Sequence, residues 1–84
     1  MKFMDALPQI EELLRDEYGD NLIDISTVER VSKDQFRVVY VVRAKIGQTE
    51  EVAVELSRHV SAAPFGLLLL RGIKVEKIRV GHVG

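Results

Sequence analysis

The sequence of 84 residues contains no cysteine and only two histidines, His59 and His82. Without cysteine the chain can form neither disulfides nor thiolate metal sites, and two histidines are too few for a histidine-built structural site. We therefore expect no bound metal. A domain this small without disulfides or a structural metal site depends on regular packing or on a partner subunit for its stability.

Long apolar runs are also absent. No stretch approaches the roughly 20 apolar residues that cross a bilayer, and the opening residues "MKFMDALPQI" lack the apolar segment of a secretory signal. We expect a cytoplasmic protein that does not contact a membrane. A chain that is 46% hydrophobic and 30% charged has the composition of an ordered domain, and its length predicts a single compact α+β domain over residues 1–84.

Charge is distributed unevenly along the chain, although the net charge is only −1. Residues 1–24 hold seven acids against Lys2 and Arg15, whereas the remainder holds ten lysines and arginines against six acids. This pattern indicates a solvated acidic helix beside a mildly basic sheet.

Sequence motifs of the common catalytic and nucleotide-binding sites are missing. The chain contains no GxGxxG, GxxxxGK[ST], HExxH or GxSxG pattern. We therefore expect a non-enzymatic protein without a cofactor and without catalytic residues.

The first twenty residues have the spacing of an amphipathic helix, with apolar side chains three and four residues apart. Asp5 is a suitable N-cap and Gly19 a suitable residue just past the C-terminal end, which places Pro8 in the first turn. The apolar face comprises Leu7, Ile10, Leu13, Leu14 and Tyr18.

Alternating residues predict three strands, over residues 21–31, 36–46 and 50–56. The second and third form a hairpin, and their inward-facing valines meet only if the loop has an odd number of residues, which favours three residues around Gly47. A last strand over residues 73–80 changes phase, so that a bulge near Glu76 and Lys77 is needed to keep one apolar face.

The stretch "SAAPFGLLLLRG", residues 61–72, predicts a second helix that Ser61 caps and Gly72 ends. The expected fold is an α+β two-layer sandwich of order α-β-β-β-α-β, with two helices on one face of a four-stranded, mainly antiparallel sheet. Four consecutive leucines point in nearly all directions around a helix, so one or two of them cannot be buried against the rest of the fold.

These surplus apolar side chains predict self-association, as a homo-oligomer or as a subunit of a larger assembly. A second apolar surface is expected on the outer face of the sheet. The predicted interface residues are Leu67, Leu68, Leu69 and Leu70 on the second helix and Val39 and Val41 on the outer face.

Two alternative functions stay open. A nucleic-acid-binding module would use Arg37, Arg43 and Lys45, which lie on one face of the strand over residues 36–46. An anion- or phosphate-binding site would use the start of the second helix, because helix N-termini attract anions. Its expected donors are Arg58, His59 and Ser61.

Overall fold

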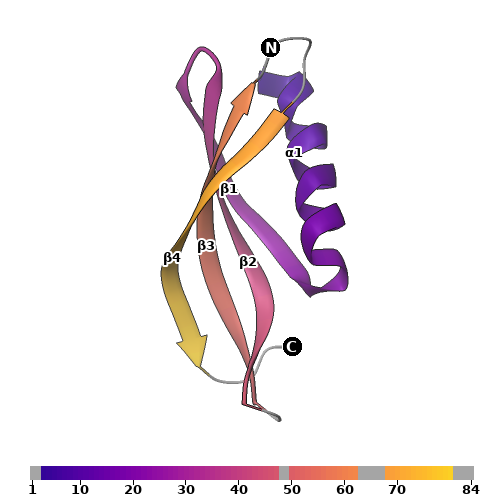
Figure 1. Cartoon of the computed structure of the whole chain (residues 1–84), viewed down its shortest axis with the longest axis vertical. Helices are drawn as coiled ribbons and strands as arrows, with labels where there is room; N and C mark the ends of the chain where they lie inside the picture. The colour runs from indigo at the N-terminus through magenta and orange to yellow at the C-terminus, as the bar shows by residue number, and fades with distance from the viewer. Residues whose placement is uncertain (1–2, 48–49, 63–67, 81–84) are drawn as a thin grey trace.

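The computed structural model, which describes residues 3–47, 50–62 and 68–80, places one helix against one antiparallel sheet (Figure 1). The four strands lie in the order of the sequence, β1-β2-β3-β4, and each neighbouring pair is antiparallel. In chain order the elements are α1 (Phe3–Tyr18), the 3₁₀ helix η1 (Gly19–Asn21), β1 (Leu22–Ser32), β2 (Gln35–Ile46), β3 (Glu50–Ala62) and β4 (Leu68–Val80).

The predicted helix over residues 61–72 is wrong, so the sheet carries one helix and not two. Ser61 and Ala62 end β3, and the chain from Leu68 onward belongs to β4, where Leu70 pairs with Val60. Residues 63–67 lie outside the described part of the chain. A short apolar run without alternation fits a strand as well as a helix, and the periodicity alone does not separate the two.

The first helix is confirmed in type and in its apolar face. Ile10 and Leu14 are fully buried, and Gly19 adopts φ 58°, the left-handed conformation expected just past a helix end. The helix begins at Phe3, so Pro8 lies inside it and not in its first turn. Ala6 is also fully buried, which the sequence pattern did not indicate.

The β2–β3 hairpin has the predicted register. Val42 pairs with Val54 and Ala44 with Val52, and the ladder closes at Ile46 and Glu50, which leaves three residues in the loop. Gly47 has φ 68°, as that turn requires. The odd number of loop residues therefore sets which side chains of the two strands share the face towards the helix.

Strand β4 contains the predicted bulge. Lys77 pairs with Glu55 and Val75 with Leu56, so that Glu76 is the extra residue. A second irregularity lies between Ser57 and His59 of β3, where the opposing stretch of β4 includes Gly72 with φ 60°.

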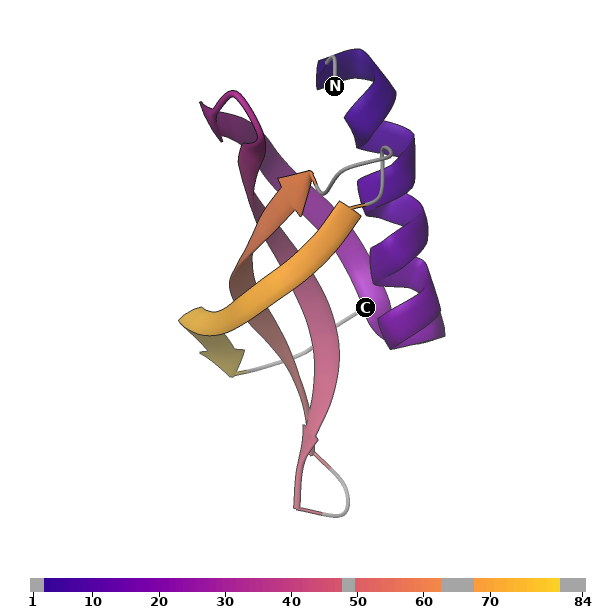
Figure 2. The ribbon, with the colours of Figure 1, turned by 45° about the horizontal axis from the view of Figure 1, so that its top comes forward.

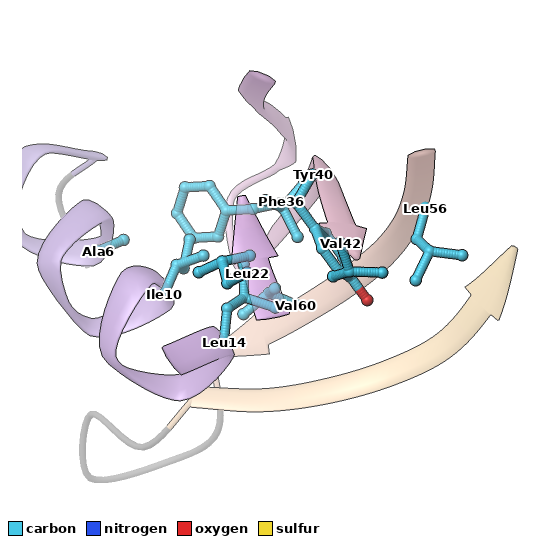
Figure 3. Packing of buried hydrophobic residues seen from close by; sticks show 10 residues of the cluster. Ala6, Ile10, Leu14, Leu22, Phe36, Tyr40, Val42, Leu56 and Val60 are labelled. Atoms are coloured by element: carbon cyan, nitrogen blue, oxygen red, sulfur yellow. The ribbon is translucent and has the colours of Figure 1, made fainter. Parts of the chain in front are cut away.

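The hydrophobic core lies between α1 and the inner face of the sheet, which is the face towards the helix (Figure 3). Tyr40, Phe36, Ile10, Leu14, Val38, Val52 and Val60 are its largest fully buried side chains. Figures 1 and 2 show α1 beside β1 and the first residues of β4, whereas the β2–β3 hairpin extends past the C-terminal end of the helix. The helix therefore covers only part of the inner face.

Candidate functional site

Three large hydrophobic side chains on β4 are more than half exposed, and we refer to Ile73, Val75 and Ile78 as the β4 surface. Their exposed fractions are 59%, 55% and 52%. Val75 pairs with Leu56 and Ile78 with Val54, both inner-face positions, so these two lie on the same face as the core. They are exposed because α1 lies over a different part of that face.

The residues predicted to form an interface are distributed differently. Leu67 lies outside the described residues, Leu68 and Leu69 begin β4, and Leu70 is half-buried against the core. Val39 is only 9% exposed and Val41 is half-buried. Among the described side chains of the sheet, the exposed apolar residues therefore gather on β4 and not at the outer-face valines.

A polar cluster occupies the outer face beside Val39, and the bulge at Glu76 brings it together. One oxygen of Glu76, Oε1, accepts hydrogen bonds from Oγ of Ser57 at 2.7 Å and from Nη2 of Arg37 at 2.9 Å. Nζ of Lys74 lies 4.0 Å from the same oxygen. The Ser57 hydrogen bond and then Arg37 hold the pKa of Glu76 below its ordinary value, although partial burial opposes this shift.

We expect Glu76→Gln to weaken the acid dependence of stability. The folded state binds the Glu76 proton less tightly than the unfolded state does, so the stabilisation is present above the unfolded pKa of about 4.3 and is lost as the pH falls through the lower folded-state pKa. Urea unfolding followed by circular dichroism measures this pH dependence of stability, at pH values from 6 to 3 that are about one unit apart. Glu12→Gln, at an exposed helix position, is the control. Identical pH profiles for the wild type and Glu76→Gln would contradict the assignment.

The cations predicted to bind nucleic acid share the outer face of β2 but already face carboxylates. Arg37 pairs with Glu76, Nε of Arg43 lies 3.7 Å from Oε2 of Glu51, and Lys45 is opposite Glu51 in the ladder. The neighbouring aromatic side chains of β2, Phe36 and Tyr40, are buried in the core. Single-strand binders combine cations with exposed aromatic rings, and this face offers no exposed aromatic ring among its described side chains.

The residues predicted to bind an anion do not converge on one site. Arg58 faces the core and is nine-tenths buried, whereas the next residue, His59, is exposed on the other face. Ser61 pairs with Gln35 within the sheet, and no helix begins there. Within the described residues, the position predicted to begin this helix therefore belongs to β3.

Arg58 instead joins α1 to the sheet. Its Nη1 donates a hydrogen bond to Oε2 of Glu17, and the hydroxyl groups of Tyr18 and Tyr40 lie 2.7 Å apart nearby. Burial alone would lower the pKa of Arg58, but the Glu17 carboxylate and Tyr40 outweigh it and raise that pKa. Burial and the hydrogen bond with Tyr18 likewise raise the pKa of Tyr40. This network, which the sequence did not indicate, fixes the C-terminal end of α1.

A groove of about 380 Å³ lies between α1 and β1. Its lining residues are Leu7, Ile10, Glu11, Ile25, Ser26, Thr27 and Val28. Glu11 is the one charged residue among them, and its carboxylate is paired with Arg15 at 3.1 Å. The groove has room for apolar groups but little that would orient a charged ligand.

No known protein family, curated protein sequence or solved structure matches this chain. Among the described residues no helix is long and apolar enough to cross a membrane. The same residues contain no group of three or more acidic or histidine side chains placed to hold a metal ion. Candidate functions therefore depend on the surfaces described above, of which the β4 surface is the most unusual.

Proposed function

We propose that this chain is a non-enzymatic interaction module that self-associates through the β4 surface. The observation that carries the proposal is the exposure of three large hydrophobic side chains within six residues of one strand. Single exposed apolar residues are ordinary on protein surfaces, but a cluster marks a contact site. Half-buried Val54, opposite Ile78 in the ladder, adjoins the cluster on the inner face and extends it.

Burial of the β4 surface in a partner would be a large gain for a domain this small. Complete burial of an exposed valine or isoleucine contributes about 1.5–3 kcal/mol, and roughly half of that remains available to a side chain that is half exposed. Three such side chains amount to a substantial part of the 5–15 kcal/mol that typically stabilises a small domain. A partner that covers the β4 surface would therefore add considerably to the stability of the fold.

The contact would use the face of the sheet and not its edge. β4 is an edge strand, but its ladder with β3 has two register irregularities, and Lys74 and Lys77 are exposed along it. β1, the other edge, has three register shifts within its length. Bulges and lysines are features by which proteins prevent strand addition at sheet edges.

The double variant Val75→Thr, Ile78→Thr tests the proposal. Threonine keeps the β-branched shape that strands favour, so the fold should persist while the apolar contact is lost. Sedimentation equilibrium should show a self-associating wild type and an association constant at least about a hundredfold lower for the variant, because four side chains per dimer lose their apolar contact. Ile23→Thr with Val31→Thr, at exposed sites on β1, is the matched control. A wild type that stays monomeric at high micromolar concentration would contradict the proposal.

A further inference from the structure

We draw no further inference here: the strongest candidate, the largely apolar groove between α1 and β1, has a lining carboxylate, Glu11, that is already paired with Arg15, and nothing in the structure shows what covers the groove.

Discussion

Phe36→Ala is expected to lower the free energy of unfolding by about 3–5 kcal/mol, the range for a phenylalanine truncated in a core. Phe36 is fully buried and lies on β2 between the helix and the sheet, where its ring packs with Ile10 and its neighbours (Figure 3). The guanidinium of Arg30 also lies 5.5 Å from the centre of the ring. The loss combines the transfer of the ring to water with the cavity that remains after the truncation.

Urea unfolding measures this effect, with Met4→Ala as the control, because Met4 is 74% exposed. The control should change stability by less than about 0.5 kcal/mol. Phe36→Leu should fall between the two, because leucine fills part of the cavity. A loss below about 1 kcal/mol for Phe36→Ala would show that this site is not central to the core.

The second large effect concerns the ion pair between Glu17 and Arg58. We expect Glu17→Gln to lower the free energy of unfolding by about 2 kcal/mol, since it leaves the guanidinium of Arg58 nine-tenths buried without its carboxylate. Nε of Arg58 already lacks a hydrogen-bond acceptor, so the remaining charge is poorly satisfied. The loss is smaller than for a fully buried pair, because the Glu17 side chain is 44% exposed and water can replace part of the contact.

The converse substitution should be milder. Arg58→Met keeps an apolar chain of similar length in the core and leaves Glu17 free to be hydrated, so we expect a loss below about 1 kcal/mol. Glu11→Gln, which removes an exposed ion pair with Arg15, is the matched control and should cost less than about 0.5 kcal/mol. If Arg58→Met destabilised the protein more than Glu17→Gln, burial of an unpaired charge would not be the main reason why loss of this ion pair lowers stability.

Local patterns in the sequence were sufficient for the elements whose two faces differ. The spacing of Ile10 and Leu14 indicated the helix face, and the alternation around Val42 and Val54 indicated the hairpin register. The phase change at Glu76 indicated a bulge, and with it the common face of Val75 and Ile78. Each of these inferences needed only residues that are close together in the chain.

The stretch containing four leucines failed because it has no such contrast. Leu69 pairs with Ser61 and Leu70 with Val60, so this part of the stretch is a strand. A helix with leucines on all sides and a strand with leucines on both faces have the same local sequence. This error also affected the prediction of the site. The expected second helix would have covered more of the inner face, whereas in the structure Val75 and Ile78 are exposed there.

The polar contacts were beyond local patterns for a different reason. Arg58 and Glu17 are 41 residues apart in the chain, and Arg37 and Glu76 are 39 apart. Whether such charges meet depends on the strand order and on where α1 crosses the sheet. An arginine in a strand, such as Arg58, looks the same in sequence whether it faces water or a buried carboxylate.

The order of the strands has a consequence for how the chain reaches its fold. Every strand pairs only with its neighbours in sequence, and the β1–β2 ladder closes with Ser32 opposite Gln35, so only two residues connect those strands. The entropy lost in closing so short a connection is small, and each strand can pair with a segment that is close to it in the sequence. The sheet can therefore form one hairpin at a time. The docking of α1 is the main step that must bring distant parts of the chain together.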